Sequence, residues 1–113
     1  MKLLIMTLMN MTNDNAAVVS RFFLAIDRLI SYGVLRGLQT FTRRYGLNRW
    51  NLQAMRKEHS AGGTFHPSWL TYMVRDYKVS PLWLLTGEGD FWMAGFDAST
   101  VQKLQINCTE KSA

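Results

Sequence analysis

Hydrophobic residues recur at three- and four-residue steps through most of the chain, which is the spacing of amphipathic α-helices. Asp14 or Asn15 is a suitable N-cap for the first predicted helix, and Gly33 ends it by supplying the left-handed conformation that a helix C-terminus prefers. Arg21 and Asp27 fall on its polar face. The apolar positions of this helix are Val19, Phe22, Phe23, Ile26, Leu29 and Ile30.

Two short helices are predicted on either side of Gly46. The first ends at Gly46 after about two turns, and Asn48 is a good N-cap for the second. The predicted inward positions are Leu38, Phe41 and Tyr45 in the first helix, and Leu52 and Met55 in the second. The predicted outward positions are Thr40, Arg43 and Arg44 in the first helix, and Arg49, Trp50, Gln53 and Lys57 in the second.

Two further helices are predicted after a loop from Gly62 to His66. Pro67 suits the first turn of the fourth helix, and Ser80 caps a short fifth helix that Gly87 closes. No alternating strand pattern occurs before residue 100, so the predicted fold class is all-α. The apolar face of the fourth helix comprises Trp69, Leu70, Met73, Val74 and Tyr77, and in the fifth helix Pro81 takes the first position while Val79 packs against Leu84.

The length of 113 residues and the apolar content of 48% suit one compact core with tails. We expect a flexible N-terminal arm over residues 1–14, a folded domain over 15–89 and a tail over 90–113. The apolar run at the start is too short to span a membrane. The tail is too apolar for a free linker, and it predicts another short element that either packs on the domain or forms a dimer surface. Its apolar residues are Phe91, Trp92, Met93, Phe96, Val101, Leu104 and Ile106.

The positive charge is concentrated between Arg28 and Lys57, where seven basic residues occur without a carboxylate. The rest of the chain holds six basic and eight acidic residues, so the formal net charge of +5 arises in this block. A block of one sign attracts polyanions, of which nucleic acid is the commonest. The seven basic residues are Arg28, Arg36, Arg43, Arg44, Arg49, Arg56 and Lys57.

The two short helices inside this block have the pattern of a helix-turn-helix. Gly46 provides the tight corner from which the second helix projects into the major groove of DNA. Arg49 can then donate two hydrogen bonds to guanine, Gln53 can pair with adenine, and Asn48 can bond a base or a phosphate. Arg43, Arg44, Arg56 and Lys57 would bind phosphates, which adds salt-sensitive affinity without sequence information.

The segment Val79–Gly89 resembles the end of the five-helix domain of the phage-repressor family, also called lambda-repressor-like or Xre-type helix-turn-helix proteins. Residues 83–89 (WLLTGEG) match the family pattern residue for residue, and the resemblance covers about Val19 to Gly89. It implies a DNA-binding domain that acts as a dimer on a pseudo-palindromic operator. Leu38 stands where the family usually has Gln, with Gln39 one step along, and Thr42 replaces a small Ala between the two helices.

The motif and the resemblance together predict two sets of DNA-contacting residues. Two positions of the Trp50 side chain are open: it could contact a thymine methyl group or a sugar, or it could fold back on Phe65 or Tyr72. The predicted base-contacting residues are Asn48, Arg49, Trp50, Gln53 and Lys57. The predicted phosphate-contacting residues are Gln39, Thr40, Arg43, Arg44 and Arg56.

The sequence contains few residues that could form a disulfide, a metal site or a catalytic site. The single Cys108 has no disulfide partner and suits a reducing cytosol. His59 and His66 lack Cys or carboxylate neighbours at metal-ligand spacing. There is no phosphate-binding loop, paired His and carboxylate on one helix, or nucleophile elbow. We therefore expect no enzyme activity, no catalytic residue, no cofactor, no metal, no small-molecule ligand and no membrane association.

The sequence predicts a cytoplasmic, sequence-specific double-stranded DNA-binding protein that acts as a homodimer. A repressor-type transcriptional regulator of phage, plasmid or mobile-element origin fits best. One alternative is a protein-interaction module, antitoxin-like or anti-repressor, that uses the same fold without specific DNA binding. Another is non-specific binding of nucleic acid or an anionic membrane through the basic block alone.

Overall fold

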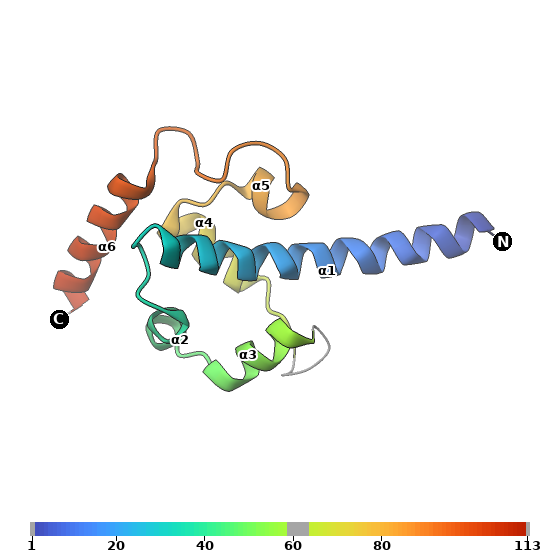
Figure 1. Cartoon of the computed structure of the whole chain (residues 1–113), viewed down its shortest axis with the longest axis horizontal. Helices are drawn as coiled ribbons and strands as arrows, with labels where there is room; N and C mark the ends of the chain where they lie inside the picture. The colour runs from blue at the N-terminus through green and yellow to red at the C-terminus, as the bar shows by residue number, and fades with distance from the viewer. Residues whose placement is uncertain (1, 59–63, 113) are drawn as a thin grey trace.

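The computed structural model describes the backbone of residues 2–58 and 64–112, and the side chains of residues 14–58 and 64–106. Within these ranges the chain forms helices joined by loops, with one isolated β-bridge between Val79 and Trp92. Figure 1 shows α1 crossing the molecule, α2 and α3 at one edge, and α6 across one end of α1. The all-α prediction is confirmed. The helices are α1 (Lys2–Ser31), α2 (Leu38–Tyr45), α3 (Arg49–Lys57), α4 (Ser68–Tyr77), α5 (Pro81–Thr86) and α6 (Ala98–Ser112).

Helix α1 begins at Lys2, so the prediction of a helix start at Asp14 or Asn15 is wrong. No Gly or Pro occurs between residues 2 and 31, and Leu, Met and Ala favour the helix on both sides of Asp14, so nothing in the backbone stops it there. The N-terminal part extends beyond the other helices in Figure 1. The boundary expected between an arm and a domain therefore falls inside a helix, and the flexibility of residues 1–14 stays a prediction.

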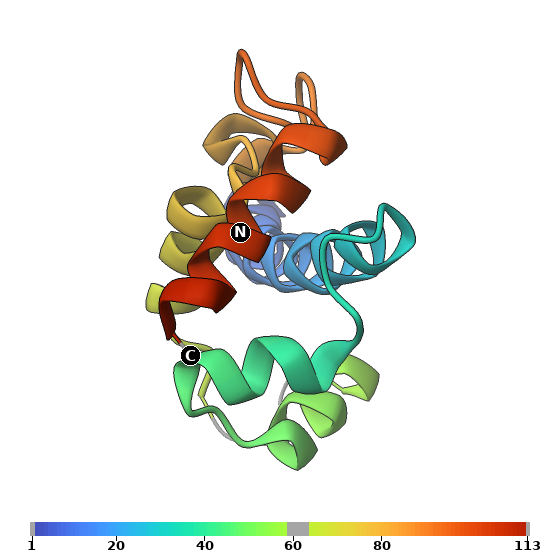
Figure 2. The same cartoon turned by 90° about the vertical axis from the view of Figure 1, so that its left-hand side faces the viewer.

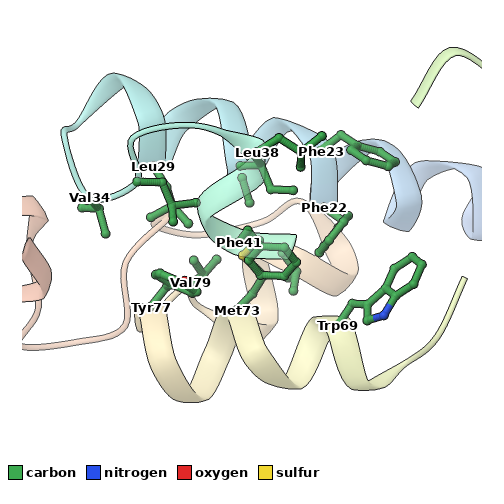
Figure 3. Close-up of a cluster of buried hydrophobic side chains, with 14 of the residues drawn as sticks. Phe22, Phe23, Leu29, Val34, Leu38, Phe41, Trp69, Met73, Tyr77 and Val79 are labelled. Atoms are coloured by element: carbon green, nitrogen blue, oxygen red, sulfur yellow. The ribbon is translucent and has the colours of Figure 1, made fainter. Parts of the chain in front are cut away.

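The core forms around the C-terminal half of α1. Phe22 has no exposed surface, and its ring contacts those of Phe23, Phe41, Phe65 and Trp69 at centroid distances between 5.1 and 5.8 Å. Figure 3 shows Phe22 and Phe41 facing the side chains of α4. Phe41 is one of the three buried residues of α2, and its contacts pack α2 against α1 and α4.

The residues predicted to cap or end the helices do so at Gly33, Ser80 and Gly87. Gly33 has a φ of 76° just beyond α1. The side chain of Ser80 accepts a hydrogen bond from the Trp83 amide, and Gly87, with a φ of 79°, donates its own amide to the Trp83 carbonyl. Pro67 lies just before α4 rather than in its first turn. Residues 62 and 63 of the predicted loop lie outside the described residues, and residues 64–66 are irregular.

The Trp83 segment is structural, as expected, and α1 holds it in place. Trp83 and Leu84 are buried beside Val79. The guanidinium of Arg21 donates to the Leu84 carbonyl at 2.8 Å and to the Leu85 carbonyl at 2.7 Å. A side chain from α1 thus satisfies carbonyl groups at the C-terminal end of α5, where a positive charge also complements the helix dipole.

The C-terminal segment packs on the domain. Phe91 and Val101 are buried in the same core as α1 and α4. The Ser80 amide donates to the Phe91 carbonyl at 2.8 Å, which fastens the segment beside the start of α5. Helix α6 has 15 residues, so the prediction of a short element was wrong in length. Leu104 and Ile106 are exposed, and their role in a dimer surface stays a prediction.

Candidate nucleic-acid interface

A left-handed glycine makes the corner between α2 and α3. Gly46 has φ 66° and ψ 35°, and its amide donates to the Thr42 carbonyl. Leu47 also donates to that carbonyl, at 2.8 Å. Asn48 then caps α3, because its side chain accepts a 3.1 Å hydrogen bond from the Asn51 amide. The predicted corner and cap are both confirmed.

Buried residues on one side of α3 leave its other side open to solvent. Leu52 and Met55 are buried in the core, as predicted. The five predicted base-contacting residues are all exposed. Steps of four residues from Arg49 through Gln53 to Lys57 place these three on one face of the helix. We call the exposed set Asn48, Arg49, Trp50, Gln53 and Lys57 the α3 surface.

Trp50 projects into solvent. Its exposed fraction is 69%, the largest among the exposed large hydrophobic residues that the structure describes. The alternative in which it folds back is wrong, because Phe65 packs on Phe22 and Trp69, and Tyr72 stacks on the Tyr45 ring at 3.9 Å. The Trp50 ring instead carries the Arg49 guanidinium, with Cζ 5.0 Å from the ring centroid.

Four of the predicted phosphate-contacting residues lie exposed on α2. They are Gln39, Thr40, Arg43 and Arg44. The Gln39 side chain lies against the backbone of Gly37. Arg43 forms no ion pair with any residue that the structure describes. Between the helices, Thr42 is buried and its hydroxyl donates to the Gln39 carbonyl at 3.2 Å, so this substitution for a small Ala leaves no unsatisfied polar group.

Arg44 contacts other helices of the protein rather than the α3 surface. Its Nη2 lies 3.9 Å from Oδ2 of Asp76, and its Nη1 donates to the Gln105 side chain on α6. Its Cζ also lies 5.3 Å from the Tyr77 ring centroid. In Figure 2, α6 lies above α2, and α3 lies below α2. The structure therefore separates Arg44 from the α3 surface, and its phosphate contact stays a prediction.

Arg56 likewise has a partner inside the protein. Its guanidinium pairs with the carboxylate of Asp27 on α1 and lies over the Phe23 ring at 5.8 Å. Its phosphate contact also stays a prediction. No local pattern indicates these pairs, because Asp27 lies 29 positions from Arg56 and Asp76 lies 32 positions from Arg44.

Arg28 belongs to the basic block by sequence, and in the structure it packs against aromatic rings. Its Cζ lies 5.2 Å from the ring centroids of both Trp83 and Phe91. With Arg44 and Arg56 engaged by carboxylates, the exposed cations on α2 and α3 that form no ion pair with described residues are Arg43, Arg49 and Lys57. Arg43 and Arg49 lie on either side of the corner at Gly46, and Lys57 lies at the end of α3.

A polar network fixes the C-terminal end of α2. The Tyr45 hydroxyl donates to Oδ2 of Asp76 at 2.6 Å, and Arg75 donates to both oxygens of that carboxylate. The Arg75 guanidinium lowers the pKa of Asp76, whereas burial raises the pKa of Tyr45. Gln105 donates to the Asp76 carbonyl at 2.6 Å. Helices α2, α4 and α6 are thereby joined just before the corner that orients α3.

The described residues contain no group of three His, Cys, Asp or Glu side chains arranged to hold a metal ion. His59 lies outside the described residues, as does the side chain of Cys108. None of the described helices is both long enough and apolar enough to cross a membrane.

No protein-family model, curated protein or solved structure matches this chain. The resemblance to phage repressors in residues 83–89 therefore stays a prediction.

Proposed function

We propose that this protein binds double-stranded DNA sequence-specifically through the α3 surface and acts as a repressor-type transcriptional regulator. One observation carries the proposal: α3 is anchored by two buried residues while it exposes Arg49, Trp50, Gln53 and Lys57 directly after a tight corner. The order of α1 to α5 also supports a lambda-repressor-like helix-turn-helix domain. Function in the cytoplasm, and an origin in a phage, a plasmid or another mobile element, belong to the same proposal.

The dimensions and side chains of α3 suit the major groove. The groove is about 12 Å wide and accepts one α-helix, whose diameter with side chains is about 10–12 Å; the nine residues of α3 extend about 13 Å along it. Arg49 can form two hydrogen bonds with the O6 and N7 atoms of guanine. Gln53 lies one turn further along and can pair with N6 and N7 of adenine.

The distribution of charge supports the same partner. Arg43 on α2 and Lys57 at the end of α3 flank the helix and suit contacts with the phosphate backbone. Ion pairs with Asp27 and Asp76 reduce the field on the sides of α2 and α3 that face the protein. The exposed side of the corner remains basic, as binding to a polyanion requires.

A homodimer completes the proposal. A single α3 covers only a few base pairs, whereas two copies would place their α3 helices in major grooves about 34 Å apart. The operator would then be a pseudo-palindrome that mirrors the symmetry of the protein.

A protein-interaction module is the second candidate function. Leu82 and Leu85 are both more than half exposed on α5, away from the α3 surface in sequence. Exposed apolar side chains of this kind are common at protein interfaces. An antitoxin-like or anti-repressor protein would use them and have no preferred DNA sequence.

Selection from a pool of random duplexes at low salt distinguishes the candidates. We expect the full-length protein to enrich a pseudo-palindromic sequence, and the Arg49→Ala/Gln53→Ala double variant to lose this enrichment while keeping its fold. Leu82→Ala serves as a matched control outside the α3 surface. Absence of any bound duplex would favour the interaction module, and equal retention of all sequences would indicate non-specific binding through charge alone.

A further inference from the structure

Arg49 and Trp50 act as one unit at the start of α3. The guanidinium carbon of Arg49 lies over the Trp50 ring at 5.0 Å from its centroid, which is a cation–π contact. Both residues follow the Asn48 cap, so the backbone that carries them is fixed by a hydrogen bond. The contact lies in solvent, because Trp50 is among the most exposed aromatic residues that the structure describes.

Stacking prepares Arg49 for a guanine. The N–H donors of a guanidinium lie in its own plane, so a ring against its face leaves them available to acceptors. The indole also limits the rotamers that the long Arg side chain samples before binding, and a side chain that is ordered in advance loses less entropy when it binds. The contact with Trp50 therefore favours Arg49 rotamers that suit bidentate hydrogen bonding.

We infer that the Arg49–Trp50 pair recognises a guanine with a thymine in the neighbouring base pair, Trp50 contacting the thymine 5-methyl group. This inference rests on the proposed DNA-binding function. The guanidinium carbon and the ring centroid lie 5.0 Å apart, less than two base-pair steps of about 3.4 Å each, so the two side chains can reach neighbouring base pairs. The thymine methyl is the apolar group that the major groove presents, and an exposed indole gains by covering it.

The test removes a single methyl group from the DNA. A duplex enriched by the wild-type protein is prepared with deoxyuridine in place of each thymine in turn. We expect one position in each half-site to weaken binding about fourfold, the value of one buried methyl group. That position is expected beside the guanine whose preference is lost in Arg49→Ala.

Three variants complete the experiment. Trp50→Ala is expected to bind the thymine and deoxyuridine duplexes equally and to show a reduced preference for the neighbouring guanine. Leu82→Ala, which removes another exposed apolar side chain, is expected to keep the wild-type preference. The Arg49→Ala/Trp50→Ala double variant is expected to lose less than the product of the two single losses, because the residues are coupled.

The outcomes separate this inference from the proposed function. If deoxyuridine substitution leaves wild-type affinity unchanged while a specific sequence is still enriched, the methyl contact is refuted and DNA binding stands. If Trp50→Ala weakens thymine and deoxyuridine duplexes by the same factor, Trp50 contacts the sugar-phosphate backbone instead, which also refutes the inference. If no duplex is enriched at all, the proposed function fails and the inference fails with it.

Discussion

The Tyr45 hydroxyl donates a 2.6 Å hydrogen bond to Oδ2 of Asp76 and so ties the last residue of α2 to α4. The Tyr45 ring also lies parallel to the Tyr72 ring at 3.9 Å. Gly46 follows directly, and α3 begins three residues later. The orientation of the α3 surface therefore depends on how firmly Asp76 holds the end of α2.

Replacing Asp76 by Asn is expected to lower the free energy of unfolding by about 1 to 3 kcal/mol at pH 7, because Tyr45 and Arg75 lose a charged acceptor. The pKa of Asp76 lies below its ordinary value of 3.8 in the folded protein, so unfolding takes up a proton in acid. The stabilisation is complete above that ordinary value and is lost as the pH falls through the folded-state pKa.

Urea unfolding of both proteins at pH 7 and at pH 3 checks this prediction. The wild type is expected to lose more stability than Asp76→Asn between the two pH values. Asp90→Asn provides a control carboxylate that is exposed and forms no ion pair with any described residue. Identical acid profiles for the wild type and Asp76→Asn would show that this carboxylate does not stabilise the fold.

Replacing Gly46 by Ala is expected to cost about 1 to 2 kcal/mol, because its φ of 66° is strained for a residue with a Cβ. A clash does not contribute, since an added Cβ would meet nothing within 4 Å. Gly46→Asn is expected to cost less, because Asn tolerates the left-handed conformation better. Urea midpoints compare the two variants, and equal losses would point to a cause other than backbone strain.

Arg49→Ala is expected to change the sequence preference of binding, whereas Arg43→Ala is expected to change the affinity for all sequences. Arg49→Ala should relax base preference by about 1 to 3 kcal/mol at one position of the selected duplex. Arg43→Ala should weaken binding to all duplexes alike and reduce the slope of log affinity against log salt by about one unit. Titrations of matched and mismatched duplexes at several salt concentrations measure both effects. Equal losses on every sequence from both variants would argue against recognition through α3.

Two substitutions on α6 test whether the C-terminal segment belongs to the core. Val101 has no exposed surface and Ile106 is 54% exposed. Val101→Ala is expected to lower the free energy of unfolding by about 1 to 3 kcal/mol through lost burial and a residual cavity. Ile106→Ala should change it by less than about 0.5 kcal/mol. Thermal unfolding of the pair checks the difference, and the absence of a shift in Val101→Ala would place α6 outside the cooperative fold.

Local hydrogen bonds account for the features that the sequence predicted well. The Asn48 and Ser80 caps, and the glycines at positions 33, 46 and 87, act on groups within a few residues, so their chemistry is visible in a short stretch of chain. The exposed positions of α3 followed from its period for the same reason. The start of α1 was missed because a good cap at Asp14 does not end a helix that nothing interrupts.

Contacts between distant parts of the chain account for what the sequence did not predict. Arg44 and Arg56 were both taken as phosphate contacts from their place in the basic block, yet each meets a carboxylate brought near by the tertiary fold. Arg21 and the carbonyls of Leu84 and Leu85 are more than sixty positions apart. Periodicity indicates which face of a helix is polar, but it does not indicate which partner that face will meet.

Because Trp50 is exposed, its fluorescence can report binding at α3. Trp69 and Trp83 are buried and Trp92 is half-buried, so a collisional quencher such as iodide reaches Trp50 most easily. An emission change on adding duplex, together with protection from iodide, would follow occupancy of α3 without any label on the DNA. Trp50→Phe would silence that signal and leave the emission of the core tryptophans to monitor folding.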